Sequence, residues 1–219
     1  VMEKFSSDPK VKSWIKAVRG MIEKKNVAYQ QIKNMQKDLS PACKKKLVSN
    51  MLVQFGVFAK ETRIAKQKEL GFFPPSLLVI DVTDRCNLKC QGCWAANCTD
   101  KEDMSMELLD RLMEESKELG IYFMSITGGE PFIRKDMMDF FERHSDMYFQ
   151  VYTNGTCITE DMAKKLGELG NVAPAISVEG LKDETNARRG PMTYDRISQT
   201  MKWLKEAGVL FGFSSMATK

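Results

Sequence analysis

From Ser76 onward the chain alternates short apolar segments with amphipathic ones, and this alternation limits the possible folds most. The apolar segments have strand length, and the segments between them have helical periodicity. Strands are expected at residues 77–81, 121–126, 148–152, 172–178 and 209–214, and helices at 106–119, 136–143, 160–169 and 194–207. Several strands are apolar throughout, which predicts an α/β fold with a parallel sheet covered on both faces.

The unusual residues of this region follow the predicted strands. A cysteine-rich run follows the first strand, and residues 128–131, 153–155 and 177–180 follow the next three. In βα-barrels the chemistry takes place where the strands end. The pattern therefore predicts an active site at the carboxyl edge of the sheet.

Cys86, Cys90 and Cys93 stand in C-x3-C-x2-C spacing directly after the first strand. A cubane iron-sulfur cluster has four irons that need ligands, so a loop with three thiolates leaves one iron open to a reacting molecule. The alternative is a structural zinc site in which Cys98 is the fourth ligand. Zinc sites usually present paired C-x2-C hooks and do not need the glycine-rich strand end that follows, so we favour the cluster.

At these cysteines the sequence resembles the radical S-adenosylmethionine (SAM) superfamily, and residues 128–131, Gly-Gly-Glu-Pro, match the family's second motif. The resemblance runs from about residue 77 to the chain end and is to the branch of the molybdenum-cofactor cyclase and the peptide maturases. It implies a partial (βα) barrel of TIM type with six strand–helix units. This chain supplies five, so we expect a fragment without the sixth strand or any C-terminal domain.

The resemblance implies an enzyme in which Cys86, Cys90 and Cys93 hold a 4Fe-4S cluster that binds SAM. Reductive cleavage then gives methionine and a 5'-deoxyadenosyl radical, which abstracts hydrogen from a substrate. The substrate is unidentified, with a peptide, a cofactor precursor and a lipid left open, and the electron donor would be a protein such as flavodoxin or ferredoxin. The alternative is a non-catalytic iron-sulfur or zinc-binding scaffold module.

The residues that the resemblance assigns to SAM follow the second, third and fourth strands. They are Gly128, Gly129, Glu130, Asn154, Ser177, Glu179 and Arg188. The first three offer acceptors for the ammonium group, the next three face the ribose hydroxyls, and the arginine binds the methionyl carboxylate, with Arg189 as its alternative.

Many members carry an aromatic residue just before the third cysteine, where this chain has Gly92. Trp94 either replaces that residue or packs.

Residues 1–72 differ in charge from residues 73–219. The first segment holds 16 Lys and Arg against 6 Asp and Glu, whereas the second holds 17 against 23. Helical patterns at 11–23 and 27–35, and a third that begins at Ser40-Pro41 and stops before Gly71, predict a basic helical extension before the radical SAM core. We expect its apolar stripe to pack on the barrel. Contact with an anionic membrane surface is less favoured, and nucleic acid is not expected as a partner.

The remaining features exclude several classes of protein. His144 is the only histidine, which excludes zinc hydrolase motifs and histidine-based triads. No apolar run is long enough to span a bilayer and no export signal is present, so we expect a cytoplasmic protein with reduced thiols. Of the other cysteines, Cys43 is expected to pack in a helix and Cys157 to lie near the active-site mouth.

Overall fold

The computed structural model describes residues 37–97 and 102–216, together with positions 12, 16, 20 and 33. By its contacts the chain divides into Val1–Leu39 and Ser40–Lys219, and the second unit is described below. The helices predicted at 11–23 and 27–35 fall almost entirely outside the described residues, and so does Cys98. The predicted boundary at residue 72 between a basic extension and the catalytic core stays a prediction.

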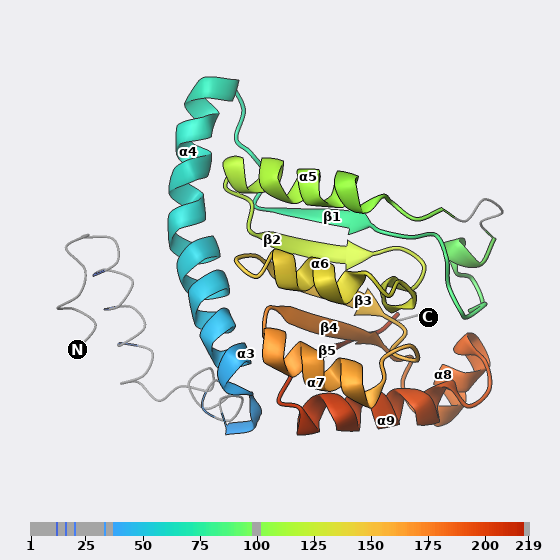
Figure 1. Cartoon of the computed structure of the whole chain (residues 1–219). Coiled ribbons are helices and arrows are strands. Elements are labelled where there is room, and N and C mark those ends of the chain that lie inside the picture. Colours follow the sequence, from blue (N-terminus) through green and yellow to red (C-terminus); the bar gives the residue numbers. More distant parts are fainter. Residues whose placement is uncertain are drawn as a thin grey trace. The chain divides into compact units, whose positions relative to one another are not determined.

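Strands of the second unit form one parallel sheet, in which strand order follows chain order. Their bounds are β1 Leu77–Asp81, β2 Phe123–Thr127, β3 Tyr148–Thr153, β4 Val172–Ser177 and β5 Gly212–Ser214. All the arrowheads point the same way in Figure 1, toward the edge where the predicted site residues follow the strands. The sheet confirms the predicted fold class, although β5 begins three residues later than expected.

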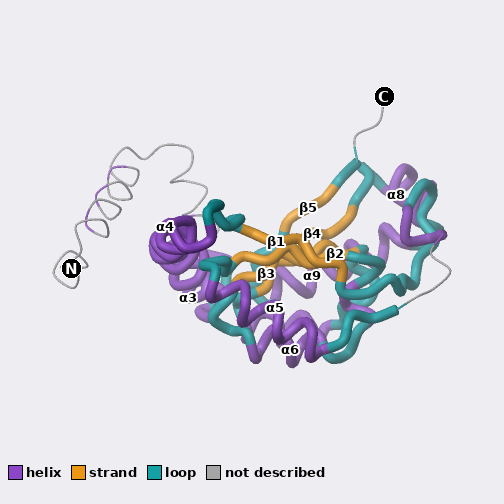
Figure 2. Tube along the Cα trace, turned by 90° about the horizontal axis from the view of Figure 1, so that it is seen from above, coloured by secondary structure: helices purple, strands orange, loops and turns teal. Residues whose placement is uncertain are grey.

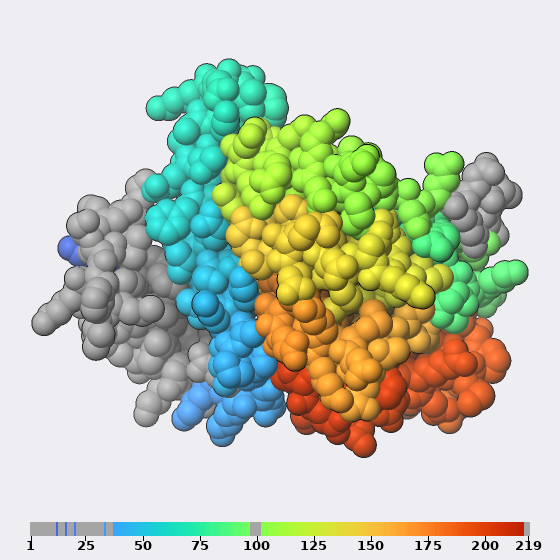
Figure 3. Space-filling model, in the orientation of Figure 1, coloured from blue at the N-terminus to red at the C-terminus, as the bar shows by residue number. Residues whose placement is uncertain are grey.

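Four helices connect these strands and pack on one face of the sheet. They are α5 Met106–Glu118, α6 Met137–Arg143, α7 Glu160–Leu169 and α9 Thr193–Glu206. Figure 2 shows α5, α6 and α9 on the same side of the curved sheet, and in Figure 3 side chains of α5, α6 and α7 cover that side. The core between helices and sheet contains the large buried side chains Leu109, Met113, Met124, Phe140, Phe141, Phe149, Leu166 and Ile176.

The other face of the sheet corrects one prediction. In the described part of the chain, Leu77, Val79 and Tyr152 alternate with core residues along their strands, yet they are exposed. Among the described residues helices therefore cover only one face, and the expectation of two covered faces was wrong. In a partial barrel the second face is the concave inner wall, which the strands themselves line.

The structure contains a further helix, α8 Lys182–Arg189, that the sequence did not predict. Its residues are almost all polar, so no apolar periodicity marks it. The carboxylate of Glu184 accepts the Leu181 N–H at 3.0 Å and thereby caps the first turn. The helix begins soon after β4, and its last turn carries Arg188 and Arg189.

A long helical column crosses the amino ends of the strands, opposite the predicted site (Figure 1). It consists of α3 Pro41–Lys46, the π-helix η2 Leu47–Phe58 and α4 Ala59–Leu70. Its predicted start is confirmed, since the Ser40 hydroxyl accepts the Cys43 N–H at 3.0 Å. Its predicted end is confirmed by Gly71, which has a φ of 77°.

The packing face of this column differs from the stripe predicted from the sequence, which contains Leu47, Val48, Met51, Leu52, Phe55 and Phe58. Val48, Leu52 and Phe58 are exposed, whereas Asn50 is buried and donates hydrogen bonds of 2.9 Å to the carbonyls of Ser145 and Met147. The stripe was predicted for an α-helix. The i→i+5 hydrogen bonds of a π-helix change the number of residues in each turn, so residues spaced by three and four no longer share one face.

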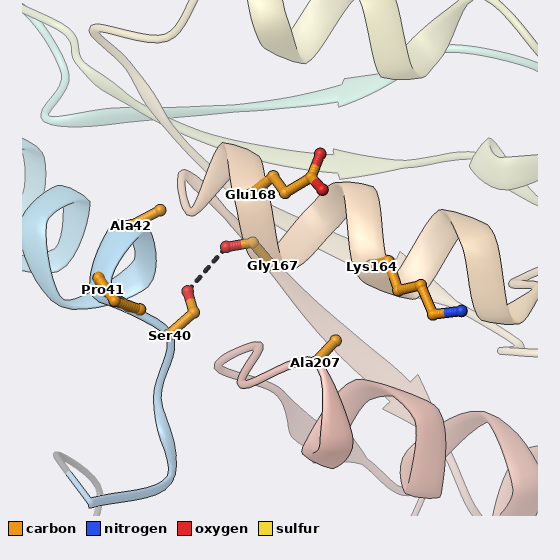
Figure 4. A pocket seen from close by; sticks show the side chains of 7 residues that line it. All are labelled: Ser40, Pro41, Ala42, Lys164, Gly167, Glu168 and Ala207. Atoms are coloured by element: carbon orange, nitrogen blue, oxygen red, sulfur yellow. Dashed lines mark hydrogen bonds between the residues drawn. The ribbon is translucent and has the colours of Figure 1, made fainter.

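A cavity of about 410 Å³ lies where α3 meets α7 and the end of α9 (Figure 4). Ser40 donates a hydrogen bond of 2.7 Å to the Gly167 carbonyl there, and a Cβ atom on Gly167 would lie 2.4 Å from the carbonyl oxygen of Ala207. The lining contains none of the predicted site residues. This cavity belongs to the packing of the helices at the amino edge of the sheet.

Candidate functional site

The three cysteines lie in a loop whose two ends are joined at its neck. The loop leaves β1 at Val82 and returns at Met104, where the Met104 N–H donates to the Val82 carbonyl at 3.1 Å. Thr83 and Asp103 form an antiparallel bridge beside it, and Arg85 forms an ion pair with Asp103. The cysteine loop, defined here as residues 82–104, is therefore closed at its base before it reaches the cysteines.

The thiols of this loop raise one another's pKa values, and the Cys86 sulfur accepts hydrogen bonds from N–H groups. Burial raises the pKa values of Cys86 and Cys90. The Glu130 carboxylate and the Cys93 thiol raise the pKa of Cys86 further, and the Cys93 and Cys86 thiols raise that of Cys90 further. The Cys86 sulfur lies 3.4 Å from the Leu88 nitrogen and 3.8 Å from Asn154 Nδ2, both of which donate to it. Hydrogen bonds to cysteine sulfur are among the features that set the potential of iron-sulfur clusters.

The donor set fits a cluster better than a single ion. Within residues 37–97 and 102–216, no three His, Cys, Asp or Glu side chains lie close enough together to hold one metal ion. A cubane cluster does not require its thiolates to meet at one metal ion, because each thiolate binds a different iron. Three thiols in one closed loop, with N–H donors on a sulfur, therefore suit the 4Fe-4S cluster. The zinc alternative requires Cys98, which lies outside the described residues.

Gly128 and Gly129 pack directly against the cysteine loop. The Gly129 N–H donates to the Thr83 carbonyl at 2.7 Å, and the next N–H donates to the Arg85 carbonyl at 2.8 Å. A Cβ atom on Gly128 would lie 2.4 Å from the Thr83 oxygen, and one on Gly129 would lie 2.2 Å from the Arg85 oxygen. The glycines thus bring the end of β2 into contact with the loop. Their contact with SAM stays a prediction.

The Glu130 carboxylate joins the ends of β2 and β3. It is fully buried and accepts hydrogen bonds from Thr153 Oγ1 at 2.7 Å, the Asn154 N–H at 2.7 Å and the Phe132 N–H at 3.1 Å. Burial raises its pKa in spite of these donors. The side chain therefore orients the third strand end, and the predicted ammonium contact falls most naturally to the carbonyl groups of this segment.

Amide side chains connect the end of β3 with the cysteine loop. Asn154 is buried and donates from Nδ2 to Asn87 Oδ1 at 2.9 Å, while Asn87 donates to Thr156 Oγ1 at 2.8 Å. Cys157 is half-buried beside this network, and burial raises its pKa to about 11. Asn87 and Thr156 were not predicted from the sequence, although Asn87 directly follows Cys86 and Thr156 directly follows the segment 153–155.

Glu179 and the two arginines of α8 bind one another. Glu179 Oε1 accepts from Arg188 Nη1 and from Arg189 Nη2, the latter at 2.6 Å, while Oε2 accepts the Met216 N–H at 3.1 Å. The carbonyl of Arg188 accepts the Gln91 N–H at 2.8 Å, which joins α8 to the cysteine loop. The predicted ribose and carboxylate ligands are therefore neighbours, and they lie beside the predicted cluster site.

A cavity of about 390 Å³ opens at this junction. Its lining comes from the cysteine loop, the end of α8 and the segment after β5, namely Gly92, Cys93, Trp94, Glu179, Arg188, Arg189, Ser214, Ser215 and Met216. Ser177 ends β4 in register with Ser214 of β5, at the same edge of the sheet. The structure thus brings every predicted site residue to one edge, while their individual contacts with SAM stay predictions.

The pH dependence of this cluster tests how strongly Glu179 is held. Burial raises the pKa of Glu179, but the hydrogen bonds from Arg189, the Met216 N–H and Arg188, together with the positive charge of Arg189, outweigh it and hold the pKa below its usual 4.5. A carboxyl with a depressed folded-state pKa stabilises the fold above its unfolded pKa and loses that contribution as pH falls through the folded value. Glu179→Gln should therefore lower the unfolding free energy by about 1.5–3 kcal/mol at neutral pH. That difference should shrink below about pH 4.5.

Denaturant unfolding of both proteins across this pH range measures the effect. Asp183→Asn, in the first turn of α8, is the control, because the Asp183 side chain is exposed and accepts no hydrogen bond from the described residues. If Glu179→Gln lost no more unfolding free energy than Asp183→Asn, or lost the same amount at every pH, the assigned ion pairs would be contradicted.

Comparison with known proteins shows the family of the chain. The family model described as the Radical SAM superfamily matches residues 80–216, and the chain therefore belongs to the radical SAM superfamily. The cofactors of this family are a 4Fe-4S cluster and SAM, as the sequence predicted.

None of the helices among the described residues is long and apolar enough to cross a membrane.

Individual relatives are similar over part of their length. The chain is 30% identical over 141 residues to Fe-coproporphyrin III synthase of Methanosarcina barkeri, covering 62% of this chain and 35% of that protein. It is 30% identical over 152 residues to mycofactocin maturase MftC of Mycolicibacterium smegmatis, covering 67% and 38%. Among solved structures, Streptococcus suis SuiB bound to S-adenosylmethionine has a TM-score of 0.63 at 25% identity, covering 73% of this chain and 38% of that one.

Proposed function

We propose that this chain is the catalytic core of a radical SAM enzyme that acts on a peptide. The cluster would supply the electron that breaks a carbon-sulfur bond of SAM, giving methionine and a 5'-deoxyadenosyl radical that abstracts hydrogen from the substrate. The observation that carries the proposal is the meeting of the cysteine loop, the glycine-rich end of β2 and the Glu179–arginine cluster at one sheet edge.

The residues that would hold the cluster are Cys86, Cys90 and Cys93. Cys90 is buried, so one ligand is shielded from water, whereas the other two are partly accessible. The N–H groups of Leu88 and Asn154 next to the Cys86 sulfur would stabilise negative charge there and orient the thiolate. In this way the end of β3 takes part in presenting the cluster ligands.

The cavity beside Cys93 would receive the methionyl part of SAM. Apart from that thiol, its described lining carries the two guanidinium groups of Arg188 and Arg189 against the single carboxylate of Glu179. This leaves one positive charge in excess, which suits one ligand carboxylate. Arg188 would turn from Glu179 to the SAM carboxylate. Glu179 Oε1 would keep its hydrogen bond from Arg189 and could accept a second one from a ribose hydroxyl in place of Arg188.

The peptide would lie on the concave face of the sheet. Val79 and Tyr152 are exposed there, on strands that end beneath the cysteine loop. A mycofactocin maturase is among the relatives, and the SuiB structures include one bound to a precursor peptide, which supports a peptide over a lipid. The porphyrin-synthesising relative makes a cofactor precursor the second candidate. A flavodoxin or ferredoxin in the cytoplasm would supply the electron.

Anaerobic reconstitution with iron and sulfide, followed by reduction and addition of SAM, tests this function. We expect 5'-deoxyadenosine and methionine to form together, in amounts that grow with time and require both reductant and cluster. Cysteine variants outside the loop, such as Cys43→Ala, should retain this turnover, because Cys43 lies at the opposite edge of the sheet. A cluster that forms without SAM cleavage would indicate the iron-sulfur form of the scaffold alternative. Bound zinc without iron-sulfur absorption would contradict the enzyme and indicate the zinc-binding scaffold.

A further inference from the structure

Arg134 is a buried cation at the neck of the cysteine loop. It follows the short 3-10 helix η4 Pro131–Ile133 after β2, and its side chain is 3% exposed. Its Nη1 donates to the carbonyls of Val82 and Met104, each at 2.7 Å. Its Nε and Nη2 donate to the two carboxylate oxygens of Asp136 at 3.0 and 2.8 Å. One guanidinium group therefore binds both sides of the neck and is neutralised by a carboxylate.

The two carbonyls that Arg134 binds belong to the two ends of the cysteine loop. Val82 is where the chain leaves β1, and Met104 is where it returns to enter α5, so the segment between them contains all three cysteines. A planar guanidinium that binds both carbonyls sets their separation, because its N–H groups have a fixed geometry. Asp136 fixes the orientation of that plane through two parallel hydrogen bonds.

The neck has a second arginine, but it is held differently. Arg85 forms its ion pair with Asp103 on the surface, with the two side chains 44% and 34% exposed. Exposed ion pairs contribute little to stability, and water competes for their hydrogen bonds. A buried guanidinium cannot be replaced by water without a large cost, so Arg134 contributes more than Arg85 to the geometry of the neck, in addition to the main-chain hydrogen bonds that close it.

We propose that Arg134 is a positioning residue for the cluster: it fixes the neck of the cysteine loop and thereby the relative positions of the three thiols. The inference rests on the proposed cluster-binding role of these thiols. It adds that a residue shortly after the Gly-Gly-Glu-Pro motif fixes the two ends of the cysteine loop. Lysine at this position would keep a positive charge but could not bind both carbonyls and the carboxylate with one planar group.

Three variants test this role in the reconstituted chain. Arg134→Lys retains the charge, Arg134→Met removes it, and Arg85→Met is the matched control that removes the exposed arginine of the same neck. We expect both Arg134 variants to release cluster iron to a chelator about 10- to 100-fold faster than the unchanged protein, as is typical for loss of groups that orient metal ligands. They should also show an altered electron paramagnetic resonance spectrum of the reduced cluster. Arg85→Met should match the unchanged protein in both measurements.

Hydrogen exchange in the protein without cluster separates this inference from the proposed function. Amides of the cysteine loop should exchange faster in Arg134→Lys than in Arg85→Met, while amides of β2 and β3 should keep their protection. If the unchanged protein binds no cluster, the proposed function fails, and exchange still decides whether Arg134 holds the loop. Equal loop exchange in the two variants, or wild-type iron release and spectra in Arg134→Lys, would overturn the inference.

Discussion

Cys90→Ala is expected to reduce bound iron to background after reconstitution. Cys90 is the buried member of the three cysteines, and two thiolates cannot hold a cluster that already lacks one protein ligand. Iron and acid-labile sulfide per chain, together with the visible absorption of the cluster, measure the loss. SAM cleavage should fall below detection in the same variant.

Cys43→Ala is the control, because Cys43 is also buried but lies in α3 at the amino edge of the sheet. It should bind as much iron as the unchanged protein. Cys98→Ala tests the zinc alternative, in which that residue would be the fourth ligand. Full iron in Cys90→Ala, or an equal loss in Cys98→Ala, would contradict the three-cysteine site.

Gly129→Ala should destabilise the fold and disturb the cysteine loop at the same time. The new methyl group would lie 2.2 Å from the Arg85 oxygen and 2.6 Å from the Arg85 carbonyl carbon. Both are main-chain atoms, so no side-chain rotation relieves the clash. The end of β2 must separate from the loop, which breaks the 2.7 Å hydrogen bond from the Gly129 N–H to Thr83. We expect a loss of about 3 kcal/mol in unfolding free energy, from overpacking and the lost hydrogen bond together.

Gly56→Ala provides the matched control. Gly56 lies in the helical column, and a Cβ atom there would meet only the Met51 oxygen at 3.5 Å, an ordinary contact. Alanine in a helix is favoured over glycine, so this variant should be unchanged or more stable by up to about 1 kcal/mol. Denaturant unfolding gives the two free energies, and iron content shows the effect on the loop. A Gly129→Ala protein as stable and as rich in iron as Gly56→Ala would contradict the tight contact.

The strand and helix pattern was largely predictable because it is local. α7 was predicted with both of its observed ends, and Thr159 caps its first turn, since the Thr159 hydroxyl accepts the Met162 N–H at 3.2 Å. β1 was predicted with both of its observed ends. In contrast, α8 has no apolar face and was missed. Glu184 caps its first turn, and Gly190, with a φ of 104°, follows its last residue. The π-helix was missed because its hydrogen-bond pattern has no periodicity signal of its own.

The candidate site was predictable where chemistry requires a residue type at a given spacing. The three cysteines and the Gly-Gly-Glu-Pro segment are such cases, and the family match agrees with them. Arg134 was not predictable in this way, because its partners Val82 and Met104 are 52 and 30 residues away in the sequence. No spacing rule connects groups that meet only after the sheet has formed.

The amino-acid sequence alone was sufficient for the superfamily, the parallel sheet and the edge at which the chemistry is placed. These follow from local periodicity and from ligand types that iron requires, and both are encoded within short segments. Only the tertiary structure decided that the Glu130 carboxylate joins two strand ends, that Glu179 holds both arginines of α8, and that one buried guanidinium closes the cysteine loop. The physical reason is that buried polar groups must find partners, and their partners come from whichever segments the folded sheet brings beside them.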